Sequence, residues 1–141
     1  DTHRERWGTS NLCTVVLAPG LSRANIIDAL QRRHCYSTRD RNCRLTFTLN
    51  GAVMGDVIEQ PVATAAIDVG VVDPDDGDLI DSVELYRDGE VVQTLQPEAT
   101  HTRLTADLTP EPGDHYYFVK VTQADDDLLY SAPIWITVID Q

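Results

Sequence analysis

The chain has 141 residues, of which 42% are hydrophobic, and a formal net charge of −12 at pH 7. This composition argues against a disordered chain, and the absence of a run of ~18 apolar residues argues against a transmembrane helix. Residues 1–44 carry eight arginines against four acids, whereas the rest of the chain has three cations against nineteen acids. This shift indicates a module boundary, and the acidic part is unsuited to binding nucleic acid.

Residues 1–42 are predicted to form a loop, one strand and one helix. The apolar run from Cys13 to Ala18 is typical of a short buried strand. Ser22 is a good N-cap for a helix ending near Arg33, whose apolar side would hold Ile26, Ile27, Ala29 and Leu30. A unit this small cannot bury its own apolar face. We therefore expect it either to be poorly ordered, or to pack on the following domain or on a second copy, as a homo-oligomer.

All three cysteines, Cys13, Cys35 and Cys43, lie in or next to this segment. An odd number without a CxxC motif does not suggest a complete disulfide framework. We expect buried or half-buried thiols, and a Cys35–Cys43 bridge stays open as the alternative. Free cysteines favour neither a cytoplasmic nor an exported protein, so the compartment also stays open.

From Cys43 onward the hydrophobic period changes to two. Leu45, Phe47 and Leu49 alternate with polar residues, which is typical of a half-buried strand. Further strands are predicted at 52–58, 62–72, 79–87, 90–96, 101–108, 114–123 and 129–139, with turn residues such as Asp88-Gly89 between them. This spacing predicts that residues 43–141 form a mainly β domain, an immunoglobulin-like antiparallel β-sandwich of about seven or eight strands.

The sequence also gives expectations for two aromatic residues and for three histidines. Tyr117 stands two residues before the core position Val119, which predicts a tyrosine corner whose hydroxyl bonds to upstream backbone. Trp135 on the last strand is expected to pack at the core or the edge rather than to stack on a ligand. The three histidines after residue 30 are isolated in sequence and are expected at the surface or in packing: His34, His101 and His115.

Two acidic loops, 73–78 and 125–127, would lie at the same end of such a sandwich, as its B–C and F–G loops. Hard carboxylate oxygens suit calcium, so a calcium site at this tip is one interpretation. Its candidate ligands are Asp73, Asp75, Asp76, Asp78 and Asp126, with Asp125 and Asp127 beside them. The alternative is a set of solvated turn acids that keep the protein soluble, and the spacing does not fit an EF-hand.

Asp1-x-His3 is the one pair with metal-ligand spacing, since both side chains of an extended segment can reach one divalent ion. It is followed by Trp7-Gly8, by the segment RHCYST at 33–38, by NGAVMG at 50–55 and by APIW at 132–135. Together these segments resemble the end of the polymerase-and-histidinol-phosphatase (PHP) family of metal-dependent phosphoesterases, some of whose members continue into a sandwich. The departures are Ser37 for the usual alanine and Ala132 for a common serine.

The resemblance implies that Asp1 and His3 are the last metal ligands of a parent enzyme that binds zinc, manganese or iron. Its catalytic domain would precede this chain and be its partner, with residues 1–42 as the last part of that domain. The other histidine and carboxylate ligands that such a site needs are absent here. We therefore expect an accessory C-terminal domain of a metal-dependent hydrolase that is inactive as an isolated fragment, a view that the Asp-Thr-His start also favours.

The alternative is an independent immunoglobulin-like binding or spacer module of a bacterial surface or secreted protein. A binding module of this kind commonly presents a concave aromatic patch, and an aromatic content of only 6% speaks against one. The substrate and the identity of the metal do not follow from the sequence.

Overall fold

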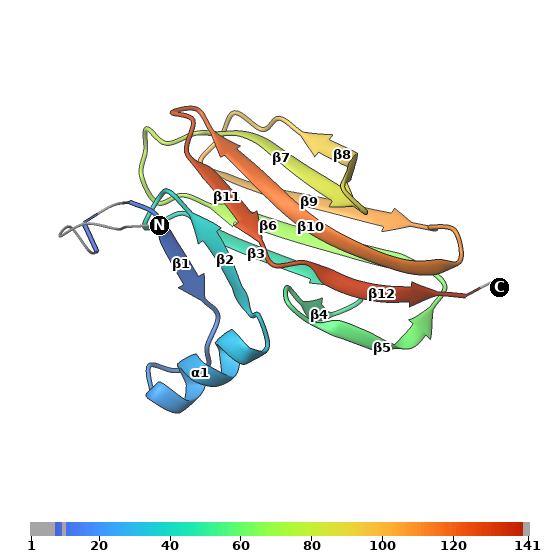
Figure 1. Cartoon of the computed structure of the whole chain (residues 1–141). Coiled ribbons are helices and arrows are strands. Elements are labelled where there is room, and N and C mark those ends of the chain that lie inside the picture. Colours follow the sequence, from blue (N-terminus) through green and yellow to red (C-terminus); the bar gives the residue numbers. More distant parts are fainter. Residues whose placement is uncertain (1–7, 10, 140–141) are drawn as a thin grey trace.

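Two antiparallel sheets pack face to face in the computed structural model, which describes residues 8, 9 and 11–139 (Figure 1). One short helix lies beside the sheets at the N-terminal end of the described chain. This architecture confirms the predicted immunoglobulin-like β-sandwich. Asp1 and His3 lie outside the described residues, so their role as metal ligands stays a prediction.

The smaller sheet has the order β4-β3-β6-β9. Its strands are β3 (Arg44–Leu49), β4 (Ala52–Val53), β6 (Ala65–Val72) and β9 (His101–Leu108). Alternation decides which face is inside, because Leu45, Phe47 and Leu49 are buried, while Arg44 before them and Thr46 between the first two are exposed. The period-two pattern of the sequence therefore predicts this sheet well.

The larger sheet has eight strands and provides the other wall of the core. It contains β1 (Cys13–Val16), β2 (Cys35–Thr38), β5 (Val57–Val62), β7 (Ile80–Arg87), β8 (Glu90–Leu95), β10 (Gly113–Gln123), β11 (Leu128–Ser131) and β12 (Ile134–Val138). The long strand β10 is central, pairing with β7 on one side and with β11 and β12 on the other. Its Val119 and Val121 are fully buried against the smaller sheet's core residues.

Two predicted strands are wrong in their extent. The segment 129–139 forms two strands because Pro133 lacks an N–H and interrupts the ladder between β11 and β12. At this break the partner changes: β11 pairs with β2, whereas β12 pairs in parallel with β5. The segment 52–58 is likewise divided between β4 and β5 by the turn at Gly55.

The strand–helix unit is joined to the larger sheet. The helix α1 (Arg23–Gln31) begins as predicted, because the Ser22 hydroxyl accepts a hydrogen bond from the Asn25 amide. The sequence missed β2, which pairs with β11 on one side and with β1 on the other. The unit therefore extends the sheet of the sandwich (Figure 1), while the predicted domain boundary at residue 43 and packing on a second copy stay predictions.

The predicted tyrosine corner is wrong in its hydrogen bond. Tyr117 is fully buried, but its hydroxyl has no hydrogen-bond partner among the described residues. The side chain acts as core packing instead, and burial raises its pKa.

The cysteine prediction is confirmed, since Cys13, Cys35 and Cys43 are free thiols and no bridge joins Cys35 to Cys43. Burial and the nearby carboxylate of Asp73 raise the pKa of Cys43 to about 12, so this thiol stays protonated and unreactive at neutral pH. Within the described residues, no helix is long and apolar enough to cross a membrane.

Candidate functional site

The end of α1 carries a strained arginine. The amide of His34 donates to the Ala29 carbonyl and that of Arg33 to the Leu30 carbonyl, which is the Schellman arrangement of a helix end. Arg33 occupies the left-handed position of this motif, with φ of 60°, where glycine is usual. A side chain at this position costs conformational energy, so the contacts that it makes must compensate.

Those contacts connect the helix to the sandwich. The Arg33 guanidinium donates to the Gly55 carbonyl at 3.1 Å and lies 5.3 Å from the ring centre of Trp135, at cation–π distance. Gly55 itself, with φ of 98°, packs so closely that a Cβ there would lie 2.3 Å from the Arg33 carbonyl oxygen. Only glycine fits this approach, and its amide donates to the Pro133 carbonyl.

A half-buried edge of the same contact holds a hydrogen bond between a histidine and an aspartate. The Nε2 atom of His34 lies 2.8 Å from the Asp56 carboxylate, whose other oxygen accepts the Val53 amide. Desolvation opposes ionisation of Asp56, but these two hydrogen bonds outweigh it and lower its pKa. We call the five residues Arg33, His34, Gly55, Asp56 and Trp135 the junction, because they fix the strand–helix unit to the sandwich.

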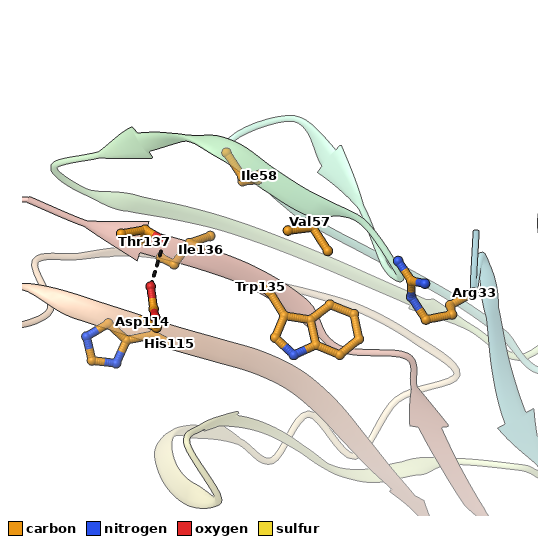
Figure 2. Close-up of a pocket in the computed structure, with 8 residues that line it drawn as sticks. All are labelled: Arg33, Val57, Ile58, Asp114, His115, Trp135, Ile136 and Thr137. Carbon is orange, nitrogen blue, oxygen red and sulfur yellow. Dashed lines mark hydrogen bonds between the residues drawn. The ribbon is translucent and has the colours of Figure 1, made fainter. Parts of the chain in front are cut away.

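An open pocket of about 540 Å³ lies beside the junction (Figure 2). Figure 2 shows Trp135 between Arg33 and the pair Asp114 and His115. Its lining residues are Arg33, Val57, Ile58, Asp114, His115, Trp135, Ile136 and Thr137. Two polar groups on its wall are already paired: the Thr137 hydroxyl donates to Asp114, and the imidazole of His115 bonds to Asp88. The pocket is thus mainly an apolar surface with an arginine at one end.

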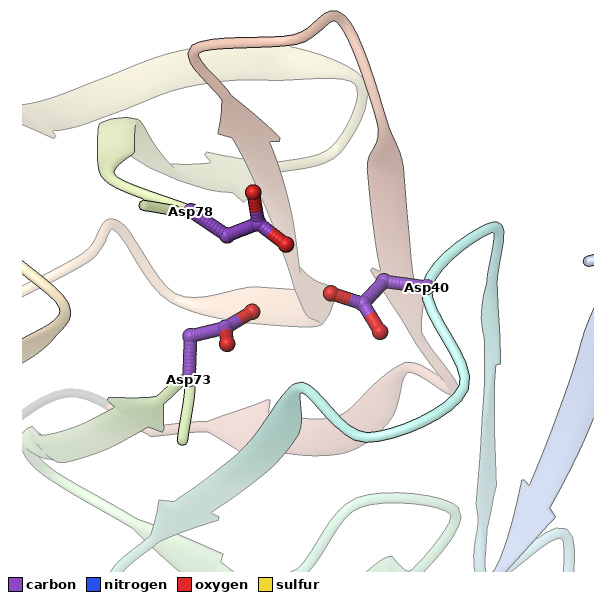
Figure 3. A group of neighbouring side chains, drawn as sticks. All are labelled: Asp40, Asp73 and Asp78. Atoms are coloured by element: carbon purple, nitrogen blue, oxygen red, sulfur yellow. The ribbon is translucent and has the colours of Figure 1, made fainter. Parts of the chain in front are cut away.

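A second cluster of functional groups lies at the loop end of the sandwich, where Asp40, Asp73 and Asp78 point toward one another (Figure 3). One oxygen from each carboxylate lies within 4.8 Å of the other two. Asp40 comes from the loop between β2 and β3, and the other two come from the loop between β6 and β7. Asp73 is buried, and its neighbours are half-buried. We call these three residues the acidic cluster.

Turn chemistry fixes two of the three carboxylates. Asp40 accepts hydrogen bonds from the amides of Asn42 and Cys43, and Asp73 accepts one from the amide of Asp75. The side-chain amide of Gln123, at the end of β10, donates to Asp73 at 2.7 Å and to Asp40 at 3.2 Å. Gln123 is 1% exposed, and its amide oxygen has no hydrogen-bond partner among the described residues.

The carboxylates perturb one another. Burial raises the pKa of Asp73, and the nearby Asp40 and Asp78 charges add to this effect. Desolvation and the charges of Asp125, Asp40 and Asp75 raise the pKa of Asp78. Burial also opposes ionisation of Asp40, but its hydrogen bonds outweigh burial and lower its pKa. The cluster thus favours either a proton or a compensating cation.

The two acidic loops do meet, as expected from the immunoglobulin order, since the Ala124 amide donates to the Leu79 carbonyl. Of the candidate calcium ligands, the structure brings only Asp73 and Asp78 into the acidic cluster. Asp75 instead accepts a hydrogen bond from Asn42, and Asp76 and Asp126 are exposed. Sequence reasoning missed Asp40 and Gln123, because nothing local indicates that they meet Asp73.

No family model matches the chain. Three proteins described as uncharacterized, from Chlamydia pneumoniae, Chlamydia muridarum and Chlamydia trachomatis, are each 26% identical to it over 87% of its length. The chain spans 22% of the length of these curated relatives. All three are bacterial, in line with the expected bacterial origin.

Among solved structures, the chain is similar to fibronectin(III)-like modules of Clostridium thermocellum CbhA, with a TM-score of 0.43 and 21% identity. That match covers 67% of this chain and 99% of the module. A Jonesia denitrificans lytic polysaccharide monooxygenase matches with a TM-score of 0.43 and 18% identity, over 60% of this chain and 57% of that one. The fold itself follows from the two sheets described above: this chain is an immunoglobulin-like module.

Proposed function

We propose that this chain is the accessory module of a longer metal-dependent phosphoesterase of the PHP type. In this proposal the sandwich does no chemistry, and the strand–helix unit packs on a preceding catalytic domain. The junction then sets the orientation of that domain. Asp1 and His3 would supply two of its metal ligands, and the metal would activate water for attack on a phosphoester.

The observation that carries the proposal is the convergence of the motif segments. The segments 33–38, 50–55 and 132–135, which are far apart in the sequence, meet at the junction. Arg33 donates to the Gly55 carbonyl, the Gly55 amide donates to the Pro133 carbonyl, and the Ala132 amide donates to the Cys35 carbonyl. Because the three segments contact one another, a protein that has one of them would need the other two. Their joint occurrence in this sequence supports the resemblance to the PHP family.

The outer side of α1 supports a packing role for the unit. Ile27 and Leu30 are 44% and 47% exposed, and Leu21 just before the helix is 97% exposed. Exposed apolar side chains on one short segment favour burial against another surface. The occupant that we propose is a preceding domain of the same protein, and the chain spans only 22% of the length of its relatives.

The test is a longer form of the protein that includes the residues encoded upstream of Asp1. We expect a His-x-His motif within about 250 residues, the size of one domain. We also expect hydrolysis of a phosphodiester such as bis(p-nitrophenyl) phosphate that requires added manganese or zinc. Asp1→Ala and His3→Ala should each lower this activity and the bound metal, on the order of 100-fold.

Asp107→Ala is the matched control, since this exposed acid on β9 lies outside the strand–helix unit and should leave activity unchanged. The isolated 141-residue chain should show no turnover above background with either metal. A longer protein without metal-dependent hydrolysis, or an isolated chain that turns over at the rate of the longer form, contradicts the proposal.

The pocket beside Trp135 favours a second candidate, an independent binding module. Its apolar wall and the Arg33 guanidinium would suit a small anionic ligand with an apolar body. The upstream sequence separates the two candidates, because a binding module requires no metal-ligand motif there. Ligand screening against wild-type and Trp135→Ala chains would then identify the binder by its loss in the variant.

A further inference from the structure

We propose that the pocket beside Trp135 binds a ring acid, by which we mean a small ring compound with a carboxylate at one end and a hydroxyl group at the other. This inference rests on the second candidate function, the binding module, and names the class of ligand that its pocket would take. It does not depend on the phosphoesterase proposal, because it uses only residues that line the pocket.

The Arg33 side chain is held in place while most of its donors stay unused. Its Nε atom donates to the Gly55 carbonyl at 3.1 Å, and its guanidinium carbon lies 5.3 Å from the ring centre of Trp135. Its two terminal nitrogens make no hydrogen bond to the described residues. They form a planar fork that can donate two parallel hydrogen bonds to one carboxylate. Because the side chain is already ordered, binding an anion costs it little further conformational entropy.

The backbone at Arg33 is strained in the position that places this fork. Its φ of 60° lies in the left-handed region, where a glycine would end the helix without strain. Strained residues of this kind cluster at binding and catalytic sites, where the surrounding structure maintains them. An arginine in place of the usual glycine therefore supports a binding role for the guanidinium.

The middle of the pocket is an apolar surface that suits the face of a ring. Trp135 lies between Arg33 on one side and Asp114 on the other (Figure 2). Val57 pairs with Trp135 across the parallel strands β5 and β12, and its side chain is 56% exposed. A flat ring can stack on indole, and the volume of about 540 Å³ is in the range of small-molecule sites.

The far end of the pocket selects a hydrogen-bond donor. One carboxylate oxygen of Asp114 accepts the Thr137 hydroxyl, and the other has no hydrogen-bond partner among the described residues. This free oxygen would accept a ligand hydroxyl and would repel a second carboxylate. The neighbouring His115 is not available as a donor, because Asp88 and the Glu111 carbonyl already engage both of its ring nitrogens.

These two ends disfavour other classes of anion. An α-amino acid would place its ammonium group beside its carboxylate and hence beside Arg33, which repels it. A polyanion would meet the Asp114 carboxylate and the net charge of −12. A single carboxylate at Arg33 with a hydroxyl at Asp114 satisfies both ends. The ring between them is either aromatic, as in a hydroxyphenyl acid, or a sugar, as in a uronic acid.

The test titrates the full 141-residue chain with two pairs of probes. Phenylacetate lacks the hydroxyl group of 4-hydroxyphenylacetate, and glucose lacks the carboxylate of glucuronate. We expect one of the two hydroxylated acids to bind in calorimetry, one molecule per chain, with a Kd at or below about 1 mM. Its partner probe should bind at least about 3-fold more weakly. In NMR spectra the indole N–H of Trp135 should shift on binding.

Variants at the two ends locate the ligand. Arg33→Gly removes the guanidinium but relieves the left-handed strain, so it separates a loss of binding from a loss of folding. It should weaken binding by about 10–100-fold, whereas Arg103→Ala, at an exposed arginine of the smaller sheet, should leave it unchanged. Asp114→Asn should weaken the hydroxylated acid by about 3–10-fold, with Asp107→Asn as its control.

Two results would overturn the inference. One is the absence of binding of both hydroxylated acids at ~10 mM, and the other is equal binding by wild type and Arg33→Gly. A ligand of another class whose binding is lost in Trp135→Ala would then keep the binding module and remove only the ring acid. Failure of the ligand class is thereby distinguished from failure of the second candidate function.

Discussion

The junction and the acidic cluster lie at the two ends of the same short strand, β2. Their charged groups differ in whether they have partners of opposite charge or polarity. At the junction, His34 pairs with Asp56, and the Arg33 guanidinium has both a carbonyl acceptor and the Trp135 ring. In the acidic cluster, three carboxylates share one small volume with an amide whose oxygen is unpaired. The groups of the junction are paired with one another, whereas burial and like charges raise the pKa of Asp73 and Asp78 in the acidic cluster.

The stability of the two regions should therefore depend on different variables. The contacts of Arg33 and Gly55 at the junction involve no titrating partner, so they should respond to changes in shape and hardly to solution conditions. A cluster of like charges should respond to pH and to divalent ions, and little to changes in shape. The predictions that follow test the two regions on these separate variables.

The largest effect is expected for Gly55→Ala at the junction. The new Cβ would meet the Arg33 carbonyl carbon and oxygen at 2.5 and 2.3 Å, and the residue would keep an unfavourable φ of 98°. We expect a loss of about 2–4 kcal/mol in the free energy of unfolding, from backbone strain and overpacking together. Urea unfolding measures it, with Gly51→Ala as control.

Gly51 also has a positive φ, of 83°, but no atom lies within 4 Å of a Cβ built there. Gly51→Ala therefore retains the strain without the clash, and it should cost about 1–2 kcal/mol. Equal losses in the two variants would show that the close approach of Arg33 to Gly55 contributes nothing.

A pair of variants at Arg33 gives the next largest effect. Arg33→Ala removes the bond to the Gly55 carbonyl and the contact with Trp135, and we expect a loss of about 1–2 kcal/mol. Arg33→Gly removes the same contacts but relieves the left-handed strain, so it should be more stable than Arg33→Ala by about 0.4–1 kcal/mol. The opposite order in urea unfolding would contradict the assignment of strain to this helix end.

These two regions also differ in what the sequence can predict. The alternation of Leu45, Phe47 and Leu49 is local, so it predicts β3 and the fold directly. The meeting of the two acidic loops follows once the immunoglobulin order is known. The sequence predicts only that Gln123 belongs to a strand, although its side-chain amide donates to Asp40, 83 positions away. That contact depends on the whole fold, and no local pattern indicates it.

The strand β2 shows a further limit of prediction from the sequence. It has four residues, and its only alternation is the burial of Tyr36 and Thr38. Such a run is too short to distinguish a strand from a loop by period, because both faces contribute two side chains. Its pairing with β11 is set by the break at Pro133, where the partner of the last strand changes, and this depends on tertiary contacts.

A smaller effect, whose size depends on pH, is expected for Asp73→Asn. Burial and like charges raise the pKa of Asp73 in the folded state. The stability that this carboxyl group contributes is therefore complete below pH 3.8, which is its pKa in the unfolded chain. It is lost as pH rises through the raised folded pKa. Without divalent ions at pH 7, Asp73→Asn should therefore be more stable than wild type, on the order of 1 kcal/mol, and equal to it at low pH. Melting temperatures across pH 3–7 measure this, with Asp107→Asn as a control.

The smallest effect concerns His115, on the wall of the pocket near the junction. Its Nδ1 atom lies 2.6 Å from the Asp88 carboxylate and its Nε2 atom 2.7 Å from the Glu111 carbonyl. Both partners are acceptors, so both ring nitrogens must carry hydrogens, which is the charged imidazolium. Desolvation lowers the pKa of His115, but these two bonds outweigh it and the net pKa is raised above 6.5.

The stability from this imidazolium is complete below pH 6.5 and is lost as pH rises through the raised pKa. Because Asp88 is 38% exposed, we expect less than about 1 kcal/mol, and His115→Gln should remove the slope in this window. The slope due to Asp73 begins at lower pH, near 3.8, and involves a different partner. Asp73→Asn should remove the slope at lower pH and leave the His115 slope unchanged. Loss of both slopes in Asp73→Asn would contradict this separation, because His115 bonds to Asp88 and Glu111 and to no member of the acidic cluster.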